Sequence, residues 1–198
     1  MQKVNIVVGR FQPFTKGHYS CVSAAKRVTG LPTVICMINV PENKVDKRHP
    51  FPSDMLINLY GSLFKNNSDI AGVVPVQSAD IVKIGQTLRG LGFEIASWTC
   101  GTDRYPDYSK KAAKYHDMAG LSDDFEVIEV PRTDEDISAT KVRNCLLNDD
   151  VDGFMSMIPD GPNKDKLYND LKAQIDSVFK FESIKRYINK LLNEKYNK

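Results

Sequence analysis

Short apolar runs rich in β-branched residues alternate with amphipathic helical patterns through the first 150 residues of the chain. Runs of this length and composition are typical of buried strands rather than helices. The predicted strands lie at residues 4–8, 33–39, 73–76, 93–99 and 125–130. Regular alternation of strand and helix predicts a parallel sheet with helices on both faces. We therefore expect an α/β fold for this part of the chain.

The strand signals stop after residue 150, and helical spacing of apolar residues takes over. The predicted apolar positions of this segment fall in two groups, namely Leu167, Leu171, Ile175 and Val178, followed by Ile184, Ile188 and Leu191. We expect two parts, an α/β domain at residues 1–150 and a helical C-terminal extension at residues 151–198. Residues 180–198 hold six Lys/Arg against two Glu. Such a helix can bind nucleic acid or an acidic surface, but it more commonly packs its apolar stripe and leaves its charges in solvent.

Composition narrows the function classes. The chain of 198 residues has 27 Lys and Arg against 25 Asp and Glu, and this near balance argues against a protein that mainly coats nucleic acid. Its four cysteines show neither CxxC nor zinc spacing, as expected of buried thiols in a reducing compartment. No apolar run approaches the length of a membrane span, and no leader pattern is present. We expect a cytoplasmic protein with no membrane partner.

Residues 9–18, which read GRFQPFTKGH, follow the first predicted strand and lead into the first helix. In an open parallel sheet, ligands bind beyond the carboxyl ends of the strands. The two glycines allow backbone to approach a ligand closely, and a helix N-terminus offers N–H groups to a phosphate. Thr15 and His18 can place a hydroxyl and an imidazole on that phosphate, and Arg10 adds charge. The alternative is a tight turn with a capping histidine.

A second phosphate site is predicted at residues 137–143, which read ISATKVR. Ser138 is placed as a helix N-cap, and Thr140 and Arg143 are three residues apart and so share one helix face. A hydroxyl, N–H groups and a guanidinium together suit the β- and γ-phosphates of a nucleoside triphosphate. This pattern is common at helix starts when it occurs alone. Its occurrence together with the GRFQPFTKGH loop favours one shared nucleotide site.

These two segments resemble the GxFxPx[T/H]xGH and ISxTxxR signatures of the nucleotidylyltransferase superfamily. The GRFQP opening is most similar to archaeal-type nicotinamide mononucleotide (NMN) adenylyltransferases, many of which have His in place of Thr15. The resemblance covers residues 1–148. It implies a Rossmann-like parallel sheet with helices on both faces.

The loop after the second predicted strand resembles the family's N-P-x-x-K stretch, displaced by one residue at the proline. A lysine here can reach the leaving phosphates, and the candidates are Lys44, Lys47 and Arg48. A solvated charged loop is an equal alternative. Ser53 is placed as the N-cap of the helical pattern that follows this loop. The family often continues with F-[ST]-x-x-x-R, but no Arg follows Ser53 before Arg89. An acceptor contact by that Arg is therefore unsupported.

The loop after the fourth predicted strand, CGTDR at residues 100–104, resembles the family's G-x-D loop. The resemblance implies that Asp103 accepts from a base amino group or a ribose hydroxyl, although a Gly/Asp turn is the alternative. The G-x-D-R form looks more like virus-encoded cytidylyltransferase-like members. We expect Trp98 in the core or a pocket wall, and no sequence partner suggests catalysis by His49 or His116.

The resemblance implies transfer of a nucleoside monophosphate from ATP to a phosphorylated acceptor, with release of pyrophosphate. The best candidate is NMN adenylyltransferase, which makes NAD. The alternatives are a cytidylyl- or adenylyltransferase with another acceptor, a catalytically silent nucleotide-binding protein, and a nucleic-acid binder that uses the basic tail. The predicted catalytic residues are His18, Thr15 and Arg143. The predicted nucleotide contacts are Gly9, Arg10, Phe11, Gln12, Gly17, Lys44, Gly101, Asp103, Arg104, Ile137, Ser138 and Thr140.

Magnesium is the cofactor implied by this chemistry, held mainly through substrate phosphates because Mg²⁺ keeps several waters. Residues 123–136 contain seven carboxylates, but they lack EF-hand spacing and are expected to form a solvated surface. No protein metal ligand is therefore expected. The expected partners are ATP or CTP and a small phosphorylated acceptor such as NMN. The sequence leaves open whether the chain forms a homo-oligomer.

Overall fold

The computed structural model describes residues 1–131 and 137–196, with side chains up to residue 189. Its centre is a sheet of five parallel strands in the order β3-β2-β1-β4-β5. The strands are β1 (Gln2–Gly9), β2 (Thr33–Ile38), β3 (Ile70–Val76), β4 (Phe93–Gly101) and β5 (Leu121–Val130). The predicted parallel sheet is confirmed. Four of the five strands extend further than their apolar runs, because strand pairing continues into neighbouring residues outside those runs.

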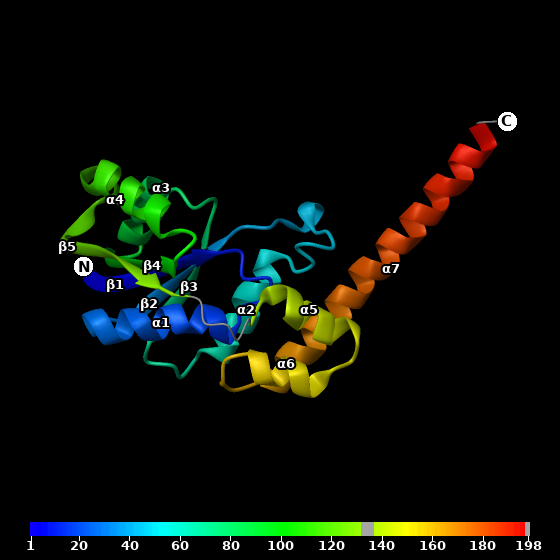
Figure 1. Cartoon of the computed structure of the whole chain (residues 1–198), viewed down its shortest axis with the longest axis horizontal. Coiled ribbons are helices and arrows are strands. Elements are labelled where there is room, and N and C mark those ends of the chain that lie inside the picture. The colour runs from blue at the N-terminus through cyan, green and yellow to red at the C-terminus, as the bar shows by residue number, and fades with distance from the viewer. Residues whose placement is uncertain (132–136, 197–198) are drawn as a thin grey trace.

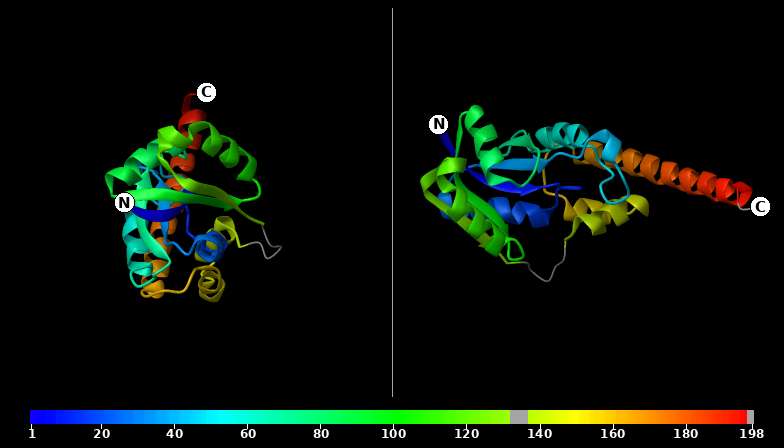
Figure 2. Two further views of the ribbon diagram at one scale, coloured as in Figure 1. Left: turned by 90° about the vertical axis from the view of Figure 1, so that its left-hand side faces the viewer. Right: turned by 90° about the horizontal axis from the view of Figure 1, so that it is seen from above.

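Helices cover both faces of the sheet, as predicted (Figures 1 and 2). The helical elements are α1 (Lys16–Thr29), a 3₁₀ turn η1 (Glu42–Lys44), α2 (Ser53–Leu63), α3 (Ile81–Gly90), α4 (Tyr105–Ala119), α5 (Ala139–Leu147), α6 (Val151–Met157) and α7 (Lys164–Tyr196). One hydrophobic cluster joins β1, β4 and their neighbours to α3 and α4, and it includes Trp98. The other joins the opposite face to α1, α2 and the C-terminal helices.

Trp98 is fully buried and stacks on Tyr108, with ring centroids 3.7 Å apart. It is therefore a core residue, one of the two placements expected from the sequence. The exposed carboxylates of β5 likewise match the expected solvated surface at Asp123, Asp124, Glu126 and Glu129. Residues 132–136 of that acidic stretch lie outside the described residues.

The structure corrects the prediction that Ser53 is the N-cap of a helix. Its place at the start of a helical pattern suggests an N-cap, but Pro52 occupies the N-cap and Ser53 is the first helical residue. The Ser53 hydroxyl instead accepts a hydrogen bond from the Val40 N–H at 2.6 Å, and the Ser53 N–H donates to the Val40 carbonyl. This tertiary pairing ties the loop after β2 to the start of α2.

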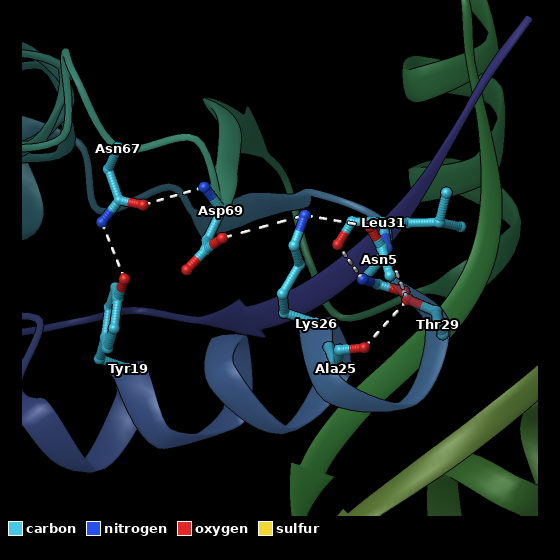
Figure 3. Close-up of polar contacts among 9 residues, drawn as sticks. Asn5, Tyr19, Ala25, Lys26, Thr29, Leu31, Asn67 and Asp69 are labelled. Atoms are coloured by element: carbon cyan, nitrogen blue, oxygen red, sulfur yellow. Dashed lines mark hydrogen bonds and ion pairs between the residues drawn. The ribbon is translucent and has the colours of Figure 1, made fainter.

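The amino ends of the strands are joined by a buried polar network around Asn5 (Figure 3). Asn5 is fully buried on β1, and its Nδ2 donates to the Leu31 carbonyl at 2.9 Å. Its Oδ1 accepts from the hydroxyls of Thr29 and Ser97 at 3.0 and 2.7 Å. Because these partners lie on α1, on the following loop and on β4, one side chain fixes α1 against the two central strands.

The C-terminal helices join the α/β part through one shared core. Leu167, Leu171 and Ile175 of α7 are buried in the same cluster as Phe14 and Leu56. The division at residue 150 remains a prediction, although this shared core shows that the extension packs closely on the sheet domain.

Only the first half of α7 is packed in this way. The C-terminal half of the helix extends away from the body (Figure 1), and its side chains Phe181, Ile184, Tyr187 and Ile188 are exposed. Of the predicted apolar positions of this helix, Leu167, Leu171 and Ile175 are therefore buried and Ile184 and Ile188 are exposed, while the side chain of Leu191 lies outside the described residues. Among the described residues, no helix has the length and apolar character needed to cross a bilayer.

Candidate active site

A cavity of about 650 Å³ opens at the carboxyl ends of the strands. Its wall comes from the ends of β1, β2 and β4, the loop after β3, and the first turn of α5. The central pair β1 and β4 marks the point where the strand order reverses in this sheet. Ligands of doubly wound sheets bind at that point, so the cavity lies where the fold favours a ligand.

The cavity wall is strongly cationic. Its described lining residues include four arginines and two histidines but no Asp or Glu, the charged and titratable members being Arg10, Arg48, Arg104, Arg143, His18 and His49. Burial lowers the pKa of the Arg143 guanidinium from its usual value, and Asp46 acts in the opposite direction. A concave wall of one sign raises the local concentration of counter-charged ligands. The cavity is therefore suited to a polyanion.

Aromatic rings fix His18 at the start of α1. The His18 ring lies 5.1 Å from the Phe11 ring centroid and 5.3 Å from that of Phe14. Phe11 folds back over Gly9, where an added Cβ would come within 2.9 Å of the Phe11 ring. Gly9 is thus required by the close approach of the Phe11 ring to the backbone.

Thr15 contacts the same ring at its Nδ1 atom. The Thr15 N–H donates to Nδ1 of His18 at 3.0 Å, and its hydroxyl oxygen lies 3.1 Å from the same nitrogen. An acceptor Nδ1 requires that the proton of the neutral ring is on Nε2. Thr15 is fully buried and is not among the residues of the cavity wall. The structure therefore places Thr15 as the residue that orients His18, and a direct phosphate contact by Thr15 stays a prediction.

Two buried side chains that hold the loop were not identified in this role from the sequence. The Tyr60 hydroxyl of α2 accepts from the Phe14 N–H at 2.7 Å and donates to the Phe11 carbonyl at 2.8 Å. Gln12, a predicted nucleotide contact, pairs its amide with the backbone of Phe51 at 2.7 and 3.0 Å. These pairs span 39 to 49 positions in the sequence, so no local pattern signals them.

Arg143 connects the two motifs. Its Nη1 donates to the Gln12 carbonyl at 2.7 Å, and its Nη2 donates to the Thr140 hydroxyl at 3.0 Å. Ser138 is the N-cap of α5, as predicted, and its hydroxyl accepts from the Lys141 N–H at 3.2 Å. The two segments, about 120 residues apart in the sequence, thus meet at one side of the cavity.

Gly17 lies where α1 meets the turn before α5. A Cβ at Gly17 would lie 3.0 Å from the Ile137 carbonyl oxygen, which is closer than ordinary packing allows. The glycine therefore permits the first turn of α1 to lie against the start of the second motif. Gly17, Ile137 and Ser138 are not among the lining residues of the cavity, so their contacts with a nucleotide stay predictions.

The remaining predicted contacts divide into two groups. Gly9, Arg10, Phe11, Gln12, His18, Gly101, Arg104, Thr140 and Arg143 line the cavity. Lys44 and Asp103 are exposed and are not among its lining residues, so their contacts with a nucleotide stay predictions. Of the other cations considered for the loop after β2, Arg48 lines the cavity, whereas Lys47 lies over the Phe179 ring at 4.8 Å.

Side chains that could bind a metal ion directly are few around the described part of the cavity. Within residues 1–131 and 137–189, no group of three or more His, Cys, Asp or Glu side chains could hold a metal ion. The described cavity wall carries no carboxylate, and Mg²⁺ prefers oxygen ligands such as phosphates and water. A metal ion held mainly through substrate phosphates stays a prediction.

Comparison with known proteins gives a family. The sequence profile described as cytidylyltransferase-like matches residues 6–145, which is more than half of the chain and includes both motifs. No curated protein sequence matches the chain.

Solved structures share the fold at low identity. A structure provisionally described as a nicotinate-nucleotide adenylyltransferase of Vibrio parahaemolyticus is 15% identical, with a TM-score of 0.55, over 87% of this chain and 96% of that one. A bifunctional NMN adenylyltransferase/ADP-ribose pyrophosphatase of Francisella tularensis, complexed with AMP and a manganese ion, is 20% identical, with a TM-score of 0.53, over 93% of this chain and 56% of that one. A nicotinic acid mononucleotide adenylyltransferase of Plasmodium falciparum is 14% identical, with a TM-score of 0.50, over 92% of this chain and 96% of that one.

Proposed function

The chain belongs to the cytidylyltransferase-like family, and on that premise we propose that it transfers a nucleoside monophosphate from a nucleoside triphosphate to a phosphorylated acceptor. The observation that carries this proposal is the cationic cavity at the carboxyl ends of β1 and β4. It brings together His18 of the first motif and Thr140 and Arg143 of the second. Both charge and position suit a triphosphate.

The proposed reaction needs little covalent chemistry from the protein. An oxygen of the acceptor phosphate attacks the α-phosphorus, the α–β phosphoanhydride bond breaks, and pyrophosphate leaves. Rate enhancement then comes from positioning and from charge stabilisation. We assign the Nε2–H of His18 to the α- and β-phosphate oxygens, since Thr15 occupies Nδ1. We assign Arg143 and the first turn of α5 to the β- and γ-phosphates.

Arg143 is prepared for this role by its two intramolecular hydrogen bonds, to the Gln12 carbonyl and the Thr140 hydroxyl. The guanidinium carries five N–H donors, so these two bonds leave others for phosphate oxygens. Mg²⁺, carried on the phosphates, would neutralise charge on the leaving group.

ATP with NMN remains the leading substrate pair, and magnesium the leading ion. Three structural neighbours bear names of nicotinate- or nicotinamide-nucleotide adenylyltransferases, and one contains AMP with a manganese ion. The second candidate is cytidylyl transfer to another phosphorylated acceptor, which the family's description favours. Both candidates use the same phosphate contacts and differ in the base and acceptor pockets.

The experiment is to measure pyrophosphate release with Mg²⁺ for ATP and CTP, each crossed with NMN, nicotinate mononucleotide, pantetheine phosphate and alcohol phosphates. Release only with ATP and a pyridine mononucleotide supports NAD synthesis. Release only with CTP supports the second candidate. Nucleotide binding with no release from any pair would contradict transfer to these acceptors and favour a fold kept for binding alone.

A further inference from the structure

His49 lines the cavity although the transfer mechanism above assigns it no role. It lies between η1 and α2, two residues before Phe51, whose backbone pairs with the Gln12 amide. This pairing holds the His49 segment beside the loop that follows β1. His49 therefore occupies a fixed place on the wall, close to Arg10.

The contact with Arg10 determines which nitrogen of the neutral His49 ring carries the proton. Nη1 of Arg10 lies 3.4 Å from Nε2 of His49. A guanidinium only donates hydrogen bonds, so Nε2 must be the acceptor and the proton of the neutral ring must be on Nδ1. Nδ1 in turn lies 3.5 Å from Oδ1 of Asp46. The three side chains thus form a continuous chain from a carboxylate, through an imidazole, to a guanidinium.

The carboxylate at the start of this chain is itself held in place. Oδ1 of Asp46 accepts from the backbone N–H groups of Arg48 and His49 at 2.8 and 2.7 Å. Burial acts to raise the pKa of Asp46, but these two donors, together with the charges of His49 and Arg48, keep the pKa below its usual value. Asp46 is therefore ionised at neutral pH and favours the ring proton on Nδ1.

The other charged groups that face His49 are cations. Burial lowers the pKa of His49 from 6.5, and Arg10, Arg143 and Arg48 lower it further, whereas Asp46 raises it. The ring is consequently neutral at pH 7 and able to accept through Nε2. A neutral acceptor among three guanidinium groups is a means of holding one of them.

We propose that Asp46, His49 and Arg10 form a relay in which His49 is a positioning residue that directs the Arg10 guanidinium toward the phosphates of the bound nucleotide. The proposal rests on the nucleotidyl-transfer function. Arg10 is exposed, and a long side chain of this kind loses rotamer freedom when it binds. An acceptor on the cavity wall limits that freedom before the ligand arrives, and this preorganisation raises affinity.

A double-mutant cycle tests the relay. The dissociation constants of ATP and CTP with Mg²⁺ are measured by calorimetry for the full-length chain and for Arg10→Ala, His49→Ala and the double variant. We expect Arg10→Ala to weaken binding about tenfold and His49→Ala about fivefold. Because His49 acts through Arg10, the double variant should match Arg10→Ala. Independent, multiplied losses would overturn the relay.

Conservative variants separate positioning from packing. His49→Gln keeps an acceptor near the Nε2 position and should retain most of the nucleotide affinity. The affinity of Asp46→Asn should lie between those of the wild type and His49→Ala. The matched control is His116→Ala, on α4 and outside the cavity wall, which should bind as wild type does. Equal losses in His49→Gln and His49→Ala would contradict the relay alone. A wild-type chain that binds neither nucleotide would contradict the proposed function and the relay with it.

Discussion

At the amino ends of the strands, the buried Asn5 side chain bonds to α1, to β4 and to the loop between α1 and β2, whereas at the carboxyl ends four arginines and two histidines line an open cavity. Both ends carry polar side chains. At the amino ends these side chains are hydrogen-bonded within the protein, whereas at the carboxyl ends they line a cavity that a ligand can enter. The closed end stabilises the fold, and the open end retains donors for a ligand. This contrast predicts that substitutions at the two ends change different measurements.

The largest expected effect is at the open end, at His18. His18→Ala removes the Nε2–H assigned to the α- and β-phosphates, and we expect turnover to fall about a hundredfold or more, as on loss of an oxyanion donor. Steady-state pyrophosphate release gives the rate, and urea unfolding checks the fold. The matched control is His116→Ala. Near-normal turnover in folded His18→Ala would refute the site assignment.

The next effect is on triphosphate binding, at Arg143. Arg143→Ala removes a charged donor, and we expect the dissociation constant of the triphosphate to rise by roughly tenfold to a hundredfold. The dissociation constant of Arg143→Lys should fall between those of the wild type and Arg143→Ala, because a lysine keeps the charge but lacks the forked geometry. Equilibrium binding of nucleotide and of acceptor provides the readout. If only acceptor affinity changed, the two ends of the site would be reversed.

A substitution at Asn5, at the closed end, should lower the stability of the fold rather than nucleotide binding or turnover. Asn5→Leu removes an acceptor of the buried Ser97 hydroxyl and of the half-buried Thr29 hydroxyl, and we expect a loss of about 2 kcal/mol in the free energy of unfolding. Urea denaturation measures this loss, and Asn66→Leu on an exposed turn is the control. The turnover of the folded fraction should stay near that of wild type. A large fall in turnover without loss of stability would break the contrast between the two ends.

The smallest expected effect is a change in the pKa of His49 in the cavity wall. The Arg10 cation contributes to the lowered pKa of His49, so Arg10→Ala should raise that pKa toward 6.5. Burial persists in this variant and keeps the value below 6.5. NMR titration of the His49 ring measures the change, with exposed Arg27→Ala as the control. A pKa that stayed constant or fell would show that Arg10 does not act on this ring.

Much of the fold could be predicted because its signals are local. Alternating apolar runs and helical periodicity marked the strands and helices, and Ser138 marked the start of α5. Ser53 was misjudged because its hydroxyl is used by Val40, a contact that depends on the folded loop. The exposed distal part of α7 was likewise hidden, since periodicity shows an apolar stripe but not what it packs against.

Part of the candidate site could be proposed from the sequence for the same reason. His18, Thr140 and Arg143 lie in recognisable segments, and the structure brings all three to one cavity. Tyr60 and His49 contact the loop after β1 without any local pattern, because the loop residues that they contact lie 39 to 49 positions away. Such residues become visible only when the loops after β1 and β2 are packed together.

The most direct test of nucleotidyl transfer follows the α-phosphate. Triphosphate labelled at the α- or the γ-phosphate is incubated with Mg²⁺ and the acceptor identified by pyrophosphate release, and the products are separated. We predict that the α-label appears in the acceptor product and the γ-label in pyrophosphate, and that both transfers nearly vanish in His18→Ala. A γ-label found in the acceptor, or an α-label left in free nucleoside diphosphate, would contradict attack at the α-phosphorus and with it the account of this cavity.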